Sequence, residues 1–175
     1  PKGLYYLIFS FRSKGKIFLD GKIHKEESDA FVVGQPKDHR ISFFSQRDSK
    51  IVGVELTPTG LYRLFGIPVH YFNNTIEDLE MVDPYSKVLF NQLAETNDFK
   101  KITELLDQYL TLQILKKDKQ ISPYVNNAYD KISKGFNKSV DQLSKEIFIS
   151  KRQLQRSFID QVGLSPKAVI AMQKA

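Results

Sequence analysis

The chain changes character near residue 57, from short segments rich in β-branched and aromatic residues to longer segments in which apolar residues recur at helical spacing. The short segments are bounded by Gly, Pro, Asp or Ser, and they read LYYLIFSF from Leu4, KIFLDGKI from Lys16, AFVVG from Ala30, RISFFS from Arg40 and KIVGVEL from Lys50. Within the second segment, Asp20 and Gly21 stand between apolar residues, which predicts a type I′ hairpin. Strands followed by helices predict an α+β fold that begins with a small antiparallel β-sheet or barrel.

Helices are expected from residue 57 onward. Thr57 and Pro58 suit the N-cap and first position of a short helix that Gly66 ends. Two further helices are predicted over residues 84–95 and 98–116, after an acidic stretch that we interpret as a solvated loop. The residues of the second helix that recur at three- and four-residue spacing predict a buried stripe; they are Ile102, Leu105, Leu106, Tyr109, Leu112 and Gln113.

A charged run without large apolar residues, KKDKQ, follows this helix and precedes Ser122 and Pro123. We interpret residues 117–121 as a linker. The chain then divides into a first domain over residues 1–116, of a sensor or dimerisation type, and a second, all-helical domain over residues 122–175.

The composition is that of a folded protein, with 41% hydrophobic and 26% charged residues. Because the chain has no Cys, disulfides, thiolate metal sites and a cysteine nucleophile are excluded, and a reducing compartment such as the cytoplasm is expected. No apolar run has the length of a membrane span, and a signal peptide is not evident, so we expect no membrane insertion. The chain begins at Pro1 rather than Met and ends at Ala175 within an expected helix, as a fragment would.

Positive charge is concentrated in the last third of the chain. Residues 1–119 hold 17 basic and 16 acidic side chains, whereas residues 120–175 hold 9 and 4. A basic segment joined to a nearly neutral one favours a nucleic acid or another anionic surface as the partner of the last third. An ordinary solvated basic surface gives the same count, so the charge alone does not distinguish it from a surface that binds an anionic partner.

The segment SVDQLSKEIFISKRQLQRSFIDQVG from Ser139 has the pattern of a helix-turn-helix. Serines that can cap helices stand at Ser122, Ser139 and Ser150. In the second helix of the pattern, the residues predicted to be buried recur at four-residue steps, and they are Leu154, Phe158 and Val162. The side chains predicted to point away from the core, or to stand at the amino end, are Lys151, Arg152, Gln155 and Arg156.

These four residue types suit a helix lying in the DNA major groove. Arg152 and Arg156 can each bridge O6 and N7 of guanine, and Gln155 can pair with adenine. Lys151, beside the amino end of the helix, can hold a phosphate. We therefore predict DNA binding by these four residues, with a protein-interaction module of similar helices as the alternative.

The carboxy-terminal segment resembles the AraC/XylS transcriptional regulators. The resemblance lies in the serine-started second helix and in Gly163-Leu164-Ser165-Pro166, which matches the Gly-x-Ser-Pro exit of that family. It implies that residues 122–175 hold only the first of two helix-turn-helix units. The chain departs from the family at Ile159 and Asp160, where basic residues are frequent and contact phosphate.

The amino-terminal part is similar to a sensor-type domain found before some of these regulators, through LIFSF, the Val33-Gly34 step and GVELTPTGLYRLFGIP from Gly53. The resemblance implies a bacterial one-component regulator. Its first domain senses a small-molecule effector or forms a homodimer, and its second domain binds double-stranded promoter DNA, where RNA polymerase is a further partner. No residue names the effector, although aromatic residues on adjacent predicted strands are candidates to line its cavity; they are Tyr5, Tyr6, Phe9, Phe11, Phe43 and Phe44.

Enzymatic and metal-dependent functions are not indicated. The histidines, His24, His39 and His70, are spread over separate segments and contain no H-x-H pair, so we expect no metal site. The glycines form no phosphate-binding loop, and the acidic residues are not accompanied by a nucleophile or base. We expect neither a cofactor nor catalysis.

Overall fold

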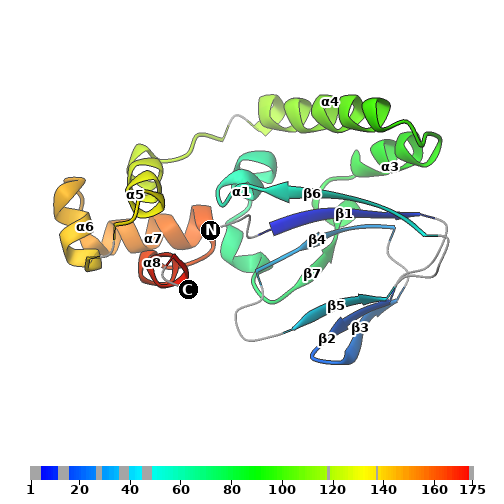
Figure 1. Ribbon diagram of the computed structural model, residues 1–175. Helices are drawn as coiled ribbons and strands as arrows, with labels where there is room; N and C mark the ends of the chain where they lie inside the picture. The colour runs from blue at the N-terminus through cyan, green and yellow to red at the C-terminus, as the bar shows by residue number, and fades with distance from the viewer. Residues whose placement is uncertain are drawn as a thin grey trace.

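In the computed structural model, the described residues are 5–11, 16–26, 29–35, 40–44, 49–117, 119–136 and 138–173. They form a mixed α/β structure with a small four-stranded antiparallel sheet, a second sheet of three strands, and helices (Figure 1). The mixed class and the small antiparallel sheet expected from the sequence are confirmed.

The four-stranded sheet has the order β6-β1-β4-β7. Its strands are β6 (Lys50–Leu56), β1 (Tyr5–Phe11), β4 (Ala30–Val33) and β7 (Ile76–Asp78). The central strand β1 pairs antiparallel with both neighbours, so that Leu7 lies opposite Val32 on one side and Val54 on the other. Tyr5, Leu7 and Phe9 of β1 are completely buried, and this face of the sheet forms the main core.

The three-stranded sheet has the order β3-β2-β5, with β2 (Lys16–Leu19), β3 (Lys22–Glu26) and β5 (Ile41–Phe44). Asp20 and Gly21 join β2 to β3 with φ angles of 52° and 77°, which confirms the type I′ turn. Ile17 of β2 packs in a second core cluster with Phe31, Val33 and Ile76 of the larger sheet. The two sheets are therefore held together by apolar contacts on the face opposite the main core.

Helices cover the main-core face of the larger sheet. Figure 1 shows α3 (Ser86–Ala94) and α4 (Phe99–Lys117) on one side of this sheet and the β2, β3 and β5 strands on the other. Phe11 of β1 stacks on Phe90 of α3, with ring centroids 4.6 Å apart. Leu105, Tyr109 and Gln113 of α4 are buried as expected, but Leu112 is 53% exposed, so its predicted burial is wrong because the buried stripe of α4 is narrow.

The first helix after the strands, α1 (Gly60–Phe65), begins two residues later than the sequence predicts. Thr57 and Pro58 precede it in a turn, in which the Gly60 amide donates to the Thr57 carbonyl at 2.8 Å. The N-cap prediction for Thr57 is therefore wrong. Gly66, with a φ of 69°, ends the helix as expected.

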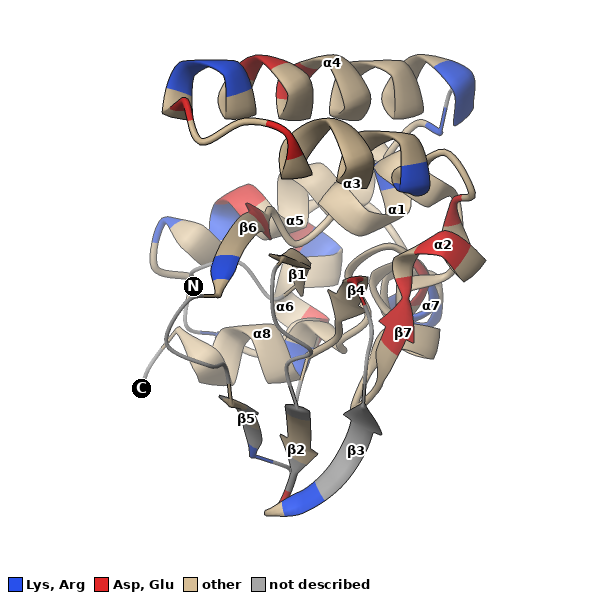
Figure 2. Cartoon of the chain, turned by 90° about the vertical axis from the view of Figure 1, so that its right-hand side faces the viewer, with Lys and Arg blue, Asp and Glu red and all other residues tan. Residues whose placement is uncertain are grey.

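The acidic stretch is not the solvated loop that its composition suggests. It follows the 3₁₀ helix η1 (Val69–Phe72) and contains β7 and α2 (Leu79–Val82). Figure 2 shows the acidic residues of these two elements in red. The Asp83 side chain is buried, and its Oδ2 accepts hydrogen bonds of 2.7 Å from both the Tyr109 hydroxyl and the side-chain amide of Gln113. Asp83 thus ties the end of α2 to α4.

Gly34, after β4, is required by a close backbone approach. A Cβ atom at this position would lie 1.4 Å from the Phe72 carbonyl oxygen, and the Gly34 amide donates to the Thr75 carbonyl at 3.0 Å. The absence of a side chain therefore allows β4 to contact η1 and the start of β7.

The carboxy-terminal part consists of α5 (Pro123–Ser133), α6 (Val140–Glu146), α7 (Lys151–Val162) and α8 (Pro166–Met172). Their buried apolar residues belong to the same core cluster as those of the larger sheet. None of the helices within the described ranges is long and apolar enough to cross a membrane.

Candidate nucleic-acid interface

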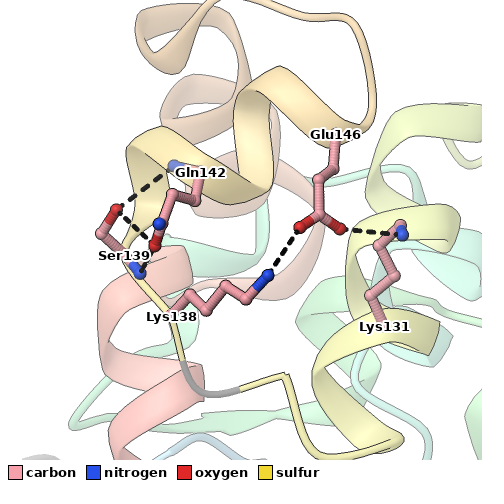
Figure 3. A network of polar contacts seen from close by, with 5 residues as sticks. All are labelled: Lys131, Lys138, Ser139, Gln142 and Glu146. Atoms are coloured by element: carbon pink, nitrogen blue, oxygen red, sulfur yellow. Dashed lines mark hydrogen bonds and ion pairs between the residues drawn. The ribbon is translucent and has the colours of Figure 1, made fainter.

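Helix α6 begins at a capping box. The Ser139 hydroxyl accepts from the Gln142 amide at 3.2 Å, and the Gln142 side chain accepts in return from the Ser139 amide at 3.1 Å (Figure 3). The capping role predicted for Ser139 is confirmed, and this arrangement satisfies amide groups that have no partner within the helix. Leu143 and Ser144 of α6 are buried.

Glu146, at the end of α6, connects this helix to its neighbours. Its carboxylate lies 3.1 Å from the Lys131 ammonium of α5 and 3.5 Å from that of Lys138, as Figure 3 shows. The hydrogen bond from Lys131 lowers the pKa of Glu146 below its ordinary value. The ion pairs help to fix α6 relative to α5.

Helix α7 is divided into a buried side and an exposed side. The Ser150 hydroxyl caps its first turn by accepting from the Gln153 amide at 3.2 Å, as the sequence predicts. Leu154, Phe158 and Val162 are completely buried, which confirms the predicted stripe. The serine predicted to cap α5, Ser122, makes no such side-chain bond; its amide instead donates to the Gln161 side chain at 2.9 Å.

The four predicted contact residues do not have equal positions on α7. Arg152 and Arg156 are exposed, one helical turn apart, on the side away from the buried stripe. Gln155 is half-buried beside that stripe. Lys151 is exposed at the first position of the helix, where its ammonium lies 3.0 Å from the Asp141 carboxylate of α6.

A cleft of about 580 Å³ lies where α6, α7 and α8 meet. Lys138, Lys151 and Lys167 line it together with Gln155, and Asp141 is the acidic residue among its lining residues. The cleft is therefore cationic and adjoins the side of α7 that carries Gln155. Sequence reasoning missed Lys138 and Lys167, because they lie outside α7 and only folding brings them beside it.

The carboxyl end of α7 is fixed by residues of the first half of the chain. The Tyr5 hydroxyl donates to the Val162 carbonyl at 3.0 Å, and the side-chain amide of Asn73 donates to the Gly163 carbonyl at 2.6 Å. The Tyr5 hydroxyl also lies 3.1 Å from Asn73 Oδ1. Burial raises the pKa of Tyr5 well above its ordinary value, so its hydroxyl remains a donor at neutral pH.

The Gly-Leu-Ser-Pro exit of α7 has the local structure that the sequence predicts. Gly163 has a φ of 79° and ends α7, while Leu164 is buried. The Ser165 hydroxyl accepts from the Ala168 amide at 3.2 Å, and Pro166 occupies the first turn of α8. Asp160, in the last turns of α7, faces η1, where His70 Nδ1 lies 3.7 Å from its Oδ1.

The aromatic residues suggested for an effector cavity are distributed over both faces of the sheet. Tyr5, Phe9 and Phe11 fill the main core, whereas Tyr6 packs on the second cluster. Phe44 is 61% exposed, and the side chain of Phe43 lies outside the described part. These aromatic residues therefore do not converge on one cavity in the part of the chain that the structure describes.

The histidine and acidic side chains form no metal-binding cluster within the described ranges. Among these residues, no three such side chains lie close enough together to hold a metal ion. His39 is outside the described residues, as is the side chain of His24.

Comparisons of the chain with protein-family models, with curated proteins and with solved structures found no match. Its function is therefore inferred from the residues themselves.

Proposed function

We propose that the chain is a sequence-specific DNA-binding transcriptional regulator of the AraC/XylS type. In this proposal α6, the turn over residues 147–150 and α7 form a helix-turn-helix, and α7 lies in the major groove of double-stranded DNA. The observation that carries the proposal is the division of α7, which buries Leu154, Phe158 and Val162 while it exposes Arg152 and Arg156. A helix in the major groove needs one side to pack on its domain and another side with forked donors.

Each of the four contact residues has a role that fits its position. Arg152 and Arg156 bind guanine, and Gln155 binds adenine at the border of the cationic cleft. Lys151 binds a phosphate, exchanging the Asp141 carboxylate for the DNA backbone. Lys138 and Lys167 add positive charge to the same cleft and strengthen the attraction to phosphate.

The first half of the chain serves as the sensor or dimerisation part of the regulator. Its support is the direct hydrogen bonding of Tyr5 and Asn73 to the carboxyl end of α7. A change in this half of the chain, caused by an effector or by a second copy, is then transmitted to the DNA-binding helix without a flexible intermediate. RNA polymerase at the promoter is the expected further partner.

Selection of duplexes from a random-sequence pool tests the proposal. The wild-type chain is expected to enrich a defined motif, with affinity that falls steeply as salt rises. The Arg152→Ala, Arg156→Ala double variant is expected to lose the motif, whereas a Lys100→Ala, Lys101→Ala variant, which removes the same charge from exposed positions on α4, keeps it. Enrichment of no motif by folded wild-type protein would reject DNA recognition.

A protein-interaction module is the second candidate, and exposed apolar residues on α2–α4 favour it. Met81, Tyr85 and Val88 are 85%, 61% and 57% exposed, and Leu115 of α4 is 71% exposed. The Lys116 ammonium lies 3.7 Å from the centroid of the Tyr85 ring, so the end of α4 adjoins the start of α3. Under this second candidate, partner binding depends on these apolar residues and responds weakly to salt and to changes at Arg152.

A further inference from the structure

One residue of the described chain has a backbone conformation that its side chain does not favour. Positive φ angles occur at Gly21, Gly66, Gly135 and Gly163, and also at Asp20, Asn74 and Phe148. Glycine adopts this region freely, and Asp and Asn tolerate it because their short polar side chains bond locally. Phe148, with a φ of 57°, has neither property.

Phe148 occupies the position after α6 at which glycine is usual. The Ile149 amide donates to the Ser144 carbonyl at 3.0 Å, and the Phe148 amide donates to the Lys145 carbonyl at 3.2 Å. This pair of bonds is a Schellman motif, whose left-handed residue is most often Gly. The same chain places Gly66, Gly135 and Gly163 at the left-handed positions that end or follow α1, α5 and α7.

Phe148 is too exposed for packing of its ring to offset the unfavourable backbone. Phe148 is 92% exposed, more than any other large apolar residue described, whereas its neighbour Ile149 packs against the core. Folding alone would therefore be served better by glycine at this position. A strained residue that persists without a stabilising contact within the fold is a candidate for a functional contact.

The surroundings of Phe148 indicate the chemistry of its partner. It lies in the turn over residues 147–150, between exposed Lys145 in the last turn of α6 and exposed Lys151 and Arg152 in the first turn of α7. Phe148 and Lys151 are three residues apart in sequence, which limits the distance between their Cα atoms to about 11 Å. An exposed ring among cations favours a polyanion that also presents apolar groups, and DNA does so through the thymine methyl and the deoxyribose.

We propose that the ring of Phe148 contacts DNA beside the groove that α7 occupies. The inference rests on the proposed DNA-binding function and extends it to a residue outside α7. The contact is apolar, so it adds affinity without adding to the salt dependence that the lysines and arginines produce.

Replacement of Phe148 by residues that suit a left-handed backbone tests the proposal. The variants are Phe148→Gly and Phe148→Asn, with Phe148→Tyr to retain an aromatic ring. The matched control is Phe99→Ala, which removes a ring that is 78% exposed at the start of α4. The probe is the duplex enriched by the wild-type chain, and both its Kd at several salt concentrations and the thermal midpoint of each variant are measured.

We expect Phe148→Gly and Phe148→Asn to bind the enriched duplex about tenfold more weakly than wild type, with an unchanged salt slope and a thermal midpoint at or above that of wild type. Phe148→Tyr and Phe99→Ala are expected to bind as wild type. Substitution of deoxyuridine for thymidine in the duplex then distinguishes a contact with the thymine methyl from a contact with the deoxyribose. If the ring contacts the methyl, the substitution weakens DNA binding by wild type but not by Phe148→Gly. If the ring contacts the deoxyribose, the substitution changes the Kd of the two proteins equally.

Two results overturn the inference while leaving DNA recognition intact. One is wild-type affinity in Phe148→Gly when the Arg152→Ala, Arg156→Ala variant has lost the motif, which would show that the ring does not contact DNA. The other is a lower thermal midpoint for Phe148→Gly, which would assign the ring to the stability of the turn. Failure of the wild-type chain to enrich any duplex overturns both the proposed function and this inference.

Discussion

The hydroxyl of Tyr5, on the first strand, donates a hydrogen bond to the carbonyl oxygen of Val162, in the last turn of α7, at 3.0 Å. The last carbonyl groups of a helix have no partner within it. Tyr5 and Asn73 supply these partners from the first half of the chain, and Gln161 of α7 accepts from the Ser122 amide at the start of α5. The orientation of α7 is therefore set jointly by the sheet and by the other carboxy-terminal helices.

Replacement of Tyr5 by Phe is expected to lower the free energy of unfolding by about 1–3 kcal/mol, because it leaves the buried Val162 carbonyl without this donor. Tyr71→Phe is the control, since Tyr71 is 65% exposed, and it is expected to unfold as wild type. Urea denaturation of both variants measures the difference. Equal stability of Tyr5→Phe and wild type would mean that water replaces the hydroxyl at this site.

Replacement of Gly163 by Ala is expected to be more destabilising than Tyr5→Phe. The added Cβ would lie 2.1 Å from the Tyr5 hydroxyl and 3.0 Å from Val69 Cγ1, so α7 must shift away from η1. Gly135→Ala is a matched control, because Gly135 also has a positive φ but a Cβ added there would meet no atom within 4 Å. We expect about 1 kcal/mol for Gly135→Ala from backbone strain alone, and a clearly larger loss for Gly163→Ala.

The Gly163→Ala effect also has an internal test. In the Tyr5→Phe background the atom nearest to the new methyl group is gone, so the two substitutions are expected to be less destabilising together than the sum of their separate effects. Strict additivity in urea denaturation would show that the clash with the hydroxyl is not the source of the loss.

The features that the sequence predicts correctly depend on neighbouring residues. The Asp20-Gly21 turn, the serine caps at Ser139 and Ser150 and the glycine at the end of α7 are each determined within about four residues. Helical spacing likewise predicts the buried stripe of α7 correctly, since that stripe depends only on the 3.6-residue period.

The features that the sequence does not predict depend on residues far apart in the chain. The contact between Tyr5 and Val162 spans 157 residues and leaves no periodic signal in either segment. The sequence suggests a solvated loop around Asp83 because its partner Gln113 lies 30 residues later, on a different helix. The sequence does not predict the cationic cleft either, because Lys138, Lys151 and Lys167 come from three separate segments that only folding brings together.

Replacement of Tyr109 by Phe is expected to reduce the free energy of unfolding by about 1.5–3 kcal/mol, because the hydroxyl donates to the buried Asp83 carboxylate at 2.7 Å. Burial raises the pKa of Tyr109, and the neighbouring carboxylate raises it further, so the hydroxyl is protonated at neutral pH. Tyr62→Phe, at a half-buried position on α1, is the comparison variant. Chemical denaturation measures both, and a loss no larger than that of Tyr62→Phe would contradict the role assigned to the bond.

The ion pairs of Glu146 are expected to make stability depend on pH in the acidic range. The pKa of Glu146 is lowered in the folded protein, chiefly by its hydrogen bond with Lys131, so the folded state favours the ionised carboxylate. The resulting stabilisation is fully present above the unfolded-state pKa of about 4.3 and is lost as pH falls through the lower folded-state value. Glu146→Gln should therefore be less stable than wild type at pH 6, and this difference should shrink below about pH 4.

Urea denaturation of wild type and Glu146→Gln across this pH range measures the difference. The Lys131→Ala background provides the control, because removal of the principal partner of Glu146 should abolish most of the pH dependence. Lys138, whose ammonium lies 3.5 Å from the same carboxylate, accounts for the part that remains. A pH-independent difference in the wild-type background would show that Glu146 acts through packing rather than charge.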